Sequence, residues 1–328
     1  MRDAEEKPDA EGKQDAEGKQ DAEGKPDADG IRLCGIGDEA AVGLEGQLRI
    51  HADLGMTGIE LRTVDGRGAH QWSASEAERI AAAVADAGLA VPVLDTPIGS
   101  WAVTVADDFD HELKILRRAA AHAALLGCDR LRVMSYPNDG RPDALWRAAA
   151  LHRMRELNRR ARDAGVTLLH ENCHGWASQS AAHTLELLQE VDGVRLVFDV
   201  GNGLAYGYEA PAFLADVLPY VDHVHIKDGT RGDGASDGAS DGASDGAAGP
   251  VFGLPGDGDA EVATCLRMLR DGGYRGWYSL EPHVAHIPHL NVSGDPARLE
   301  AGYRACAERF AALARAEWAR PRPEAAHG

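Results

Sequence analysis

Short apolar segments alternate along the chain with longer, alanine-rich segments. The short segments are rich in leucine and β-branched residues, as buried strands are, and the long ones have the 3.6-residue period of amphipathic helices. The short segments read "IRLCGIG", "TGIELR", "LAVPVLDTP", "DRLRVMSYP", "GVTLLHEN", "VRLVFDVGN", "VDHVHIKD" and "GWYSLEP". About eight successive strand–helix units predict an α/β fold, the (β/α)₈ TIM barrel, rather than a simple doubly wound sheet.

The segment "SASEAERIAAAVADAG" illustrates a predicted helix of this barrel. Ser75 and Glu78 have the spacing of a capping box at its start. Ile80 and Val84 share one apolar face, and Gly88 can take the left-handed conformation that ends a helix.

Two low-complexity segments lie outside this pattern. Residues 1–29 repeat "DAEGKQ" and contain nothing apolar to bury, which predicts a disordered acidic tail. A "DGAS" repeat predicts a flexible loop insertion at 231–249. The barrel is therefore expected at 30–318, followed by a C-terminal tail at 319–328. We favour solvated spacers over partner-recruiting segments for both repeats.

Composition narrows the class of protein. The chain has 328 residues, 44% of them hydrophobic, and a net charge of −19, about half of which comes from the two repeats. The remainder is still acidic, which disfavours nucleic-acid binding. The five cysteines form no CxxC pair, and no stretch has the length of a signal peptide core or membrane span. We expect a cytoplasmic protein without membrane or nucleic-acid partners; a homo-oligomer paired through its helices remains open.

Polar residues stand at the ends of four consecutive predicted strands. They are Glu171 in "LLHEN", Asp199 in "VFDVGN", His225 in "HVHIKD" and Glu281 in "YSLEP". In a TIM barrel these ends form the active-site face. Three carboxylates and an imidazole brought together would repel one another without a cation, which predicts one divalent ion, Mn²⁺, Mg²⁺, Co²⁺ or Zn²⁺. We expect His223, two residues earlier, to be a core histidine.

The chain from about 30 to 312 resembles the sugar phosphate isomerase/epimerase family, the xylose isomerase-like TIM barrels. The resemblance rests on "GIELR", "HEN", "FDVGN", "HVHIKD" and "LPGDGDAEVATCLRMLRDGGYRGWYSLEP". It implies that Glu171, Asp199, His225 and Glu281 bind one divalent metal, and that Glu171 and Glu281 also serve as a catalytic acid/base pair.

Five further residues are candidates for substrate binding. Arg62 either clamps a substrate oxygen or phosphate or forms a surface salt bridge. Asn202 stands where many family members have a histidine, and it cannot relay a proton near neutrality. Lys227 and Asp228 follow the ligand histidine in the family pattern, where they either set a loop or touch substrate. His283 follows the last strand.

Several aromatic residues and histidines are weaker candidates. His170 is expected to face away from Glu171, because neighbours on a strand point to opposite sides. Three histidines follow the last strand, His283, His286 and His289. We favour substrate contact or loop exposure for them over a second metal site. Packing is favoured over sugar contact for a further group, Trp72, Trp101, His174 and Trp176.

The predicted chemistry is metal-dependent isomerisation or epimerisation of a sugar, sugar phosphate or cyclitol. A chelated carbonyl acidifies the adjacent C–H, and two carboxylates can move its proton through an enediolate. Loss of a β-hydroxyl would instead make the protein an inosose-type dehydratase, and a non-catalytic sugar-binding barrel is a further alternative. The endonuclease branch fits poorly, because Asn202 and Thr230 replace the ligands that a three-zinc cluster needs.

Overall fold

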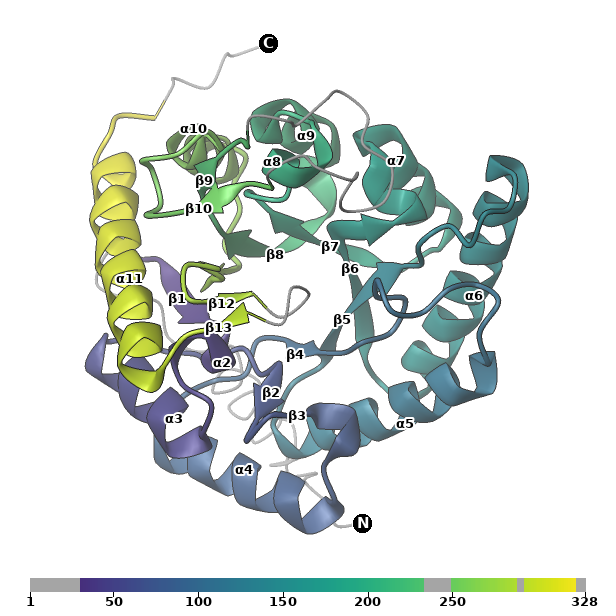
Figure 1. Cartoon of the computed structure of the whole chain (residues 1–328), viewed down its shortest axis with the longest axis horizontal. Coiled ribbons are helices and arrows are strands. Elements are labelled where there is room, and N and C mark those ends of the chain that lie inside the picture. The colour runs from purple at the N-terminus through teal and green to yellow at the C-terminus, as the bar shows by residue number, and fades with distance from the viewer. Residues whose placement is uncertain (1–29, 233–248, 288–291, 323–328) are drawn as a thin grey trace, which may run out of the picture.

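The computed structural model describes residues 30–232, 249–287 and 292–322. These residues form a curled parallel sheet surrounded by helices, and Figure 1 looks into the barrel that the sheet encloses. The predicted acidic tail and most of the "DGAS" insertion lie outside the described residues. Among the helices of the described part, none is long and apolar enough to cross a membrane.

Seven strands of the described chain form one parallel sheet. Its order is β1-β11-β8-β7-β6-β5-β4, so the last barrel strand pairs with the first. Residues 58–61 fill the gap between β1 and β4 through the single bridges Ile36–Glu60, Gly58–Ala90 and Leu61–Leu94. The predicted (β/α)₈ barrel is therefore confirmed, with "GIELR" as its irregular second strand. The strands are β1 (Arg32–Gly35), β4 (Leu94–Asp95), β5 (Arg130–Ser135), β6 (Thr167–Gly175), β7 (Arg195–Asp199), β8 (Val221–Ile226) and β11 (Trp277–Leu280).

Three short hairpins follow the carboxyl ends of barrel strands. They are β2 (Thr63–Val64) with β3 (Arg67–Gly68), β9 (Gly229–Thr230) with β10 (Val251–Phe252), and β12 (His286–Ile287) with β13 (Val292–Ser293). Because each hairpin directly continues such a strand, the extra structure is concentrated on the face where an active site is expected.

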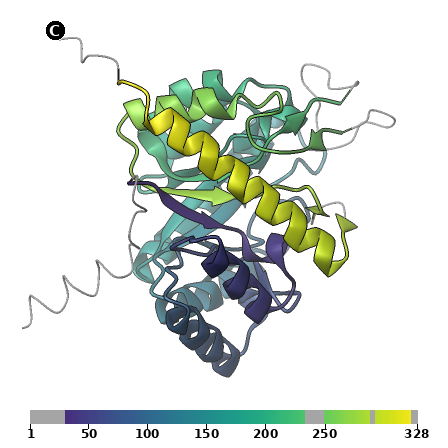
Figure 2. The same cartoon turned by 90° about the vertical axis from the view of Figure 1, so that its left-hand side faces the viewer.

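Helices cover the outside of the sheet. The longest, α11, packs beside α10 and α2 and crosses the front of the barrel in Figure 2. The helices are α2 (Gly37–Ala40), α3 (Leu44–Asp53), α4 (Ala74–Asp86), α5 (Phe109–Leu125), α6 (Asp143–Asp163), α7 (Ala181–Glu190), α8 (Gly203–Tyr206), α9 (Ala210–Val217), α10 (Val262–Asp271) and α11 (Pro296–Trp318), with 3₁₀ turns η1 (Ala69–Gln71), η2 (Trp176–Gln179) and η3 (Leu218–Tyr220).

The start of α4 corrects one prediction. The capping box is formed by Ser73 and Glu76, one pair earlier than the expected Ser75 and Glu78. The two pairs have the same spacing, and with Ser73 the helix begins two residues earlier and gains just over half a turn. At the other end, Gly88 has the predicted left-handed conformation, with φ +69°.

The barrel interior changes from apolar to acidic along its axis. Val93, Leu169 and Val197 form a small apolar cluster of their own inside the sheet. Since side chains on a strand alternate between faces, the residues two positions later point into the same interior. Those positions hold Asp95, Glu171 and Asp199, so an apolar layer supports a layer of carboxylates.

His170 is buried on the opposite face of β6 from Leu169. Neither ring nitrogen has a hydrogen-bond partner among the described residues, and burial lowers the pKa of the imidazole to about 4. An unfolded histidine has a pKa of about 6.5. Below pH 6.5 the unfolded chain therefore takes up a proton that the folded chain resists, and stability falls between pH 6.5 and about 4.

We expect His170→Leu to remove this part of the acid sensitivity. Between pH 7 and pH 5 the variant should gain about 1–2 kcal/mol relative to the unaltered protein, measured by urea unfolding in the presence of EDTA. His152→Gln, an exposed change on α6, is the control and should gain nothing. A stability difference for His170→Leu that is the same at both pH values would contradict the assignment.

Candidate functional site

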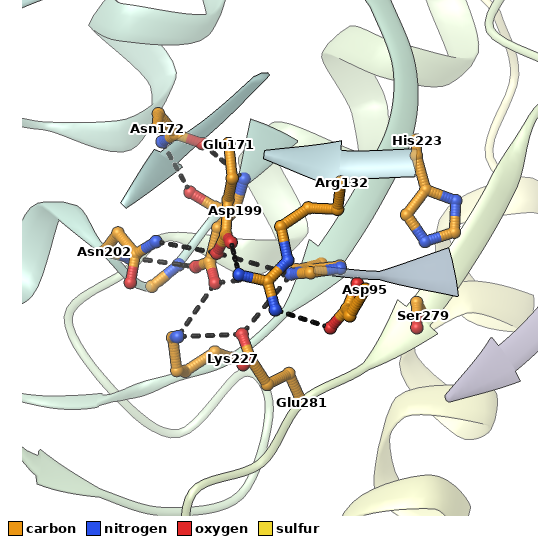
Figure 3. A network of polar contacts seen from close by, with 12 residues as sticks. Asp95, Arg132, Glu171, Asn172, Asp199, Asn202, His223, Lys227, Ser279 and Glu281 are labelled. Carbon is orange, nitrogen blue, oxygen red and sulfur yellow. Dashed lines mark hydrogen bonds and ion pairs between the residues drawn. The ribbon is translucent and has the colours of Figure 1, made fainter. Parts of the chain in front are cut away.

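The four predicted strand-end residues meet inside the barrel mouth. Each of Glu171, Asp199, His225 and Glu281 offers a ligand atom within 4.8 Å of the others, and all four are buried. They come from β6, β7, β8 and the residue after β11, and Figure 3 shows three of them converging with Lys227 and Arg132. This group is called the acid cluster below.

A buried glutamate orients the histidine of the acid cluster. Glu60 Oε1 lies 3.0 Å from His225 Nε2, and its Oε2 lies 2.9 Å from His223 Nε2 and also accepts from Ser279 Oγ. His225 Nδ1 is thereby turned toward the carboxylates of Glu281 and Glu171, at 3.4 and 3.5 Å. His223 is a hydrogen-bonded core histidine, as predicted.

Backbone contacts hold Asp199 in a fixed orientation. Its Oδ1 accepts from the N–H groups of Gly201 and Asn202, at 2.7 and 3.0 Å. Asn172 clamps the same strand end, because its amide accepts from Asp199 N and donates to Asp199 O. The other oxygen, Oδ2, is left for the acid cluster and lies 2.8 Å from Lys227 Nζ.

The carboxylate of Glu171 contacts the side-chain amide of Asn202 and the guanidinium of Arg132. Asn202 Nδ2 donates to Glu171 Oε1 at 3.4 Å, and Arg132 Nη1 lies 3.4 Å from Glu171 Oε2. Arg132 is itself held by Asp95 Oδ2, 2.6 Å from Nη2. These contacts fix both oxygens of the carboxylate.

Two cations share the carboxylate of Glu281. Arg62 Nη1 lies 2.9 Å from Oε1, and Lys227 Nζ lies 2.9 Å from Oε2. Arg62 also contacts Asp38 and Glu39, so its side chain, 12% exposed, is surrounded by carboxylates. Of the two alternatives considered for Arg62, this low exposure disfavours a surface salt bridge.

The ionisation of the acid cluster shows a shortage of positive charge. Burial raises the pKa of Asp199 to about 7, even though Lys227 opposes the shift. Burial also acts to raise the pKa of Glu171, but Arg132 and His225 outweigh it and the pKa is lowered. His225 has a pKa well above its usual value because the surrounding carboxylates outweigh the effect of burial. Asp199 and His225 therefore tend to hold protons, and a bound cation could replace these protons.

The donor set of the acid cluster fits a divalent ion. His225 Nδ1 is buried and makes no hydrogen bond of good geometry within the described chain, although it faces three carboxylates. Carboxylate oxygens with one imidazole nitrogen and no thiolate suit Mg²⁺, Mn²⁺, Co²⁺ or Zn²⁺. A carboxylate on the far nitrogen of the imidazole, here Glu60, is the usual support of a ligand histidine.

A neighbouring group of Glu39, Glu281 and His283 is less suited to a metal. His283 Nδ1 and backbone N are both 2.8 Å from the Glu39 carboxylate. Arg62 contacts Glu39 and Glu281, so a guanidinium already neutralises these acids. His286 is half-buried in β12, and the third histidine of the disfavoured second site, His289, lies outside the described residues.

The remaining predicted residues lie apart from the acid cluster. Trp72 is buried and donates to Arg67 O, and Trp176 is buried against His183, so both pack as expected. His174 contacts the hydroxyl of Tyr206 at 3.3 Å.

Asp228 faces a loop. Its two oxygens accept from the backbone N–H groups of Gly229, Gly256, Gly258 and Ala260, at 2.7–3.2 Å. A Cβ added at Gly258 would lie 2.4 Å from Asp228 Oδ1, so this close approach requires glycine. Of the alternatives for Asp228, the geometry favours setting the loop.

Sequence reasoning missed several polar residues of the site. Asp95 ends its apolar strand as the four predicted residues do, so the same signal could have found it. Glu60 and Arg132 each stand between two apolar residues of the core that packs against the helices, so strand alternation alone would have placed them on the interior face. No comparable signal marks Asn172 or Ser279.

The fold and site together define a (β/α)₈ barrel with a buried carboxylate and histidine cluster at the carboxyl ends of its strands. Residues 48–314 match the family described as xylose isomerase-like TIM barrels, and the chain belongs to that family.

Individual relatives are more distant. The chain is 30% identical over 195 residues to an inosose dehydratase of Klebsiella pneumoniae subsp. pneumoniae, a match that covers 53% of this chain and 62% of that protein, less than two thirds of its length. Among solved structures, L-ribulose 3-epimerase is 16% identical with a TM-score of 0.63, covering 88% of this chain and 95% of its own. The 3-keto-D-glucoside 4-epimerase of E. coli is 17% identical with a TM-score of 0.62, covering 86% and 98%.

Replacing Asp228 by asparagine should destabilise the protein. One of the two acceptor oxygens becomes an NH₂ group that faces backbone N–H donors, and the loss of hydrogen bonds to a buried charge should cost about 2 kcal/mol or more. Asp257→Asn in the same loop is the control, because Asp257 makes only an exposed ion pair with Arg309 and its loss should cost less than about 1 kcal/mol. Thermal or urea unfolding would measure both, and equal losses would contradict the anchoring role.

Proposed function

We propose that this protein is a divalent-metal-dependent enzyme that removes a proton next to the carbonyl group of a sugar or cyclitol. The observation that carries the proposal is the acid cluster, in which three carboxylates and one imidazole nitrogen converge. We assign Glu171, Asp199, His225 and Glu281 as metal ligands. A bound divalent ion would polarise the substrate carbonyl and lower the pKa of the adjacent C–H.

Glu171 is the proposed base. Arg132 and Asn202 fix its two oxygens, and the lowered pKa keeps it ionised at neutral pH. Glu281 is the proposed second proton-transfer group, held between Arg62 and Lys227. Burial acts to raise the pKa of its carboxyl, but Lys227 and His283 hold that pKa well below the usual range, so it would act as an acid only after it has accepted a proton. Asn202, Lys227 and His283 lie beside these two glutamates, where they could donate hydrogen bonds to substrate hydroxyl groups. We assign Arg62 to holding Glu281, and Asp228 to the loop.

Dehydration is the outcome that we favour. The α-proton passes to Glu171, and the β-hydroxyl leaves as water after receiving a proton from an acid. Support comes from the inosose dehydratase relative and from Asn202, which cannot supply the proton that a histidine there would return to the opposite face. Epimerisation or isomerisation is the second candidate, because Glu281 gives the cluster a second glutamate.

Deuterium exchange would test this chemistry. An inosose incubated with the Mn²⁺-loaded protein in D₂O should lose water, and the product should take up one deuterium at the former β-carbon when its enol becomes the ketone. Substrate recovered before completion should carry deuterium at the carbon next to its carbonyl, because the abstracted proton on a carboxylic acid exchanges with solvent. Glu171→Gln should lower the rate by about 10²–10⁴-fold. Glu186→Gln, a change on α7 at a residue paired with Arg147, should keep the rate. Turnover without deuterium in either product or recovered substrate would exclude proton transfer, and binding without turnover would favour the non-catalytic barrel.

Glu60 should control metal affinity without being a ligand. Glu60→Gln removes the charge that orients and polarises His225, so Mn²⁺ affinity measured by calorimetry should fall about 10–100-fold. Glu112→Gln is the matched control, because Glu112 is an equally buried carboxylate that pairs with Arg153 between α5 and α6. It should lose stability but retain metal affinity. A Glu60→Gln variant that binds Mn²⁺ within twofold of the unaltered protein would contradict the role of Glu60.

A further inference from the structure

Every permanent cation of the described site is already in contact with carboxylates. Arg62 contacts Asp38, Glu39 and Glu281 at 2.8–3.2 Å. Arg132 contacts Asp95 and Glu171 at 2.6 and 3.4 Å. Lys227 contacts Asp199 and Glu281 at 2.8 and 2.9 Å. Each of these three charges is therefore already balanced by acids of the protein.

The carboxylates of this network outnumber its cations. Counted with every acid ionised and every histidine neutral, seven buried acids of the described site face three permanent cations, and a divalent ion would leave two negative charges. The acids are Asp38, Glu39, Glu60, Asp95, Glu171, Asp199 and Glu281, none more than 6% exposed. A phosphate or carboxylate on the substrate would therefore enter a site that already has excess negative charge.

The loop that would cradle a phosphate holds an internal carboxylate instead. TIM barrels commonly bind phosphate with the loops after their seventh and eighth strands. Here β8 is the seventh barrel strand, and the glycine-rich loop that follows it gives the N–H groups of Gly256, Gly258 and Ala260 to Asp228. Those donors are the ones a phosphate would need.

The arginine beside this loop in the described chain is also engaged by protein groups. Arg231, next to this loop, donates to Gly203 O and Tyr208 O and pairs with Glu209 at 2.7 Å.

We propose that the substrate is an uncharged polyhydroxy ketone, a sugar or cyclitol that carries neither a phosphate nor a carboxylate group. The inference rests on the proposed function and specifies its substrate class. The acids and amides of the site recognise hydroxyl groups by hydrogen bonds, whereas an anionic substrate would meet like charge, which selects against a wrong partner.

Matched pairs of ketoses and their phosphate esters test this specificity. With the Mn²⁺-loaded full chain in D₂O, the uncharged member of a pair should exchange or turn over at least about tenfold faster than the ester. An ester that is processed as fast or faster would overturn the substrate class while leaving the proposed reaction intact. Exchange with neither member across ketohexose, ketopentose and inosose pairs would count against the proposed function itself.

Binding of inorganic phosphate tests the same inference without turnover. In EDTA, phosphate at 20 mM should raise the melting temperature no more than chloride at equal ionic strength. Asp95→Asn releases Arg132 from its 2.6 Å partner and should create phosphate stabilisation. Asp222→Asn is the control: it removes one of the two acids that pair with Arg130 on the same strand, as Asp95→Asn does for Arg132, and should create none. Saturable stabilisation of the unaltered protein by phosphate, or equal gains in both variants, would overturn the inference.

Discussion

Concentrated negative charge inside the barrel mouth is the constraint on which the rest of the site depends. Burying an ionised carboxylate is costly unless a cation or several hydrogen bonds compensate it, and this interior buries seven. Each acid accordingly has a defined partner. Arg62 and Lys227 hold Glu281, Arg132 lies between Asp95 and Glu171, and backbone N–H groups hold one oxygen of Asp199.

The same constraint explains why the interior contains histidines. Glu60 has no arginine or lysine partner among the described residues; its carboxylate is satisfied by His223, His225 and Ser279. An imidazole can contact one carboxylate with each nitrogen, so His225 joins Glu60 to the acid cluster. The strand "VDHVHI" can therefore carry two histidines inward, because its neighbours supply the acceptors that they need.

Strand alternation made much of the site predictable. Strand alternation decides whether an acid or histidine at the end of an apolar strand faces the barrel interior or the helices. The interior face is correct for four such residues, Glu171, Asp199, His225 and Glu281. Partners that come from other strands could not be found in this way. The pairing of Arg132 with Asp95, or of Glu60 with both histidines, depends on the register between strands far apart in sequence, which no local pattern encodes. The helix start at Ser73 was missed for a different reason, since two capping boxes of equal spacing overlap there.

The carboxylate of Asp228 occupies backbone N–H groups that could otherwise bind an anionic ligand. A barrel loop rich in glycine offers backbone N–H groups, and these groups bind an anion from whichever source is nearest. In this chain the anion is covalently attached to β8 and lies 2.7–3.2 Å from four donors, so its effective concentration exceeds that of any free ligand. With the loop satisfied internally and the cations engaged by Glu171, Asp199 and Glu281, the proposed preference for uncharged substrates follows from what these groups already hold.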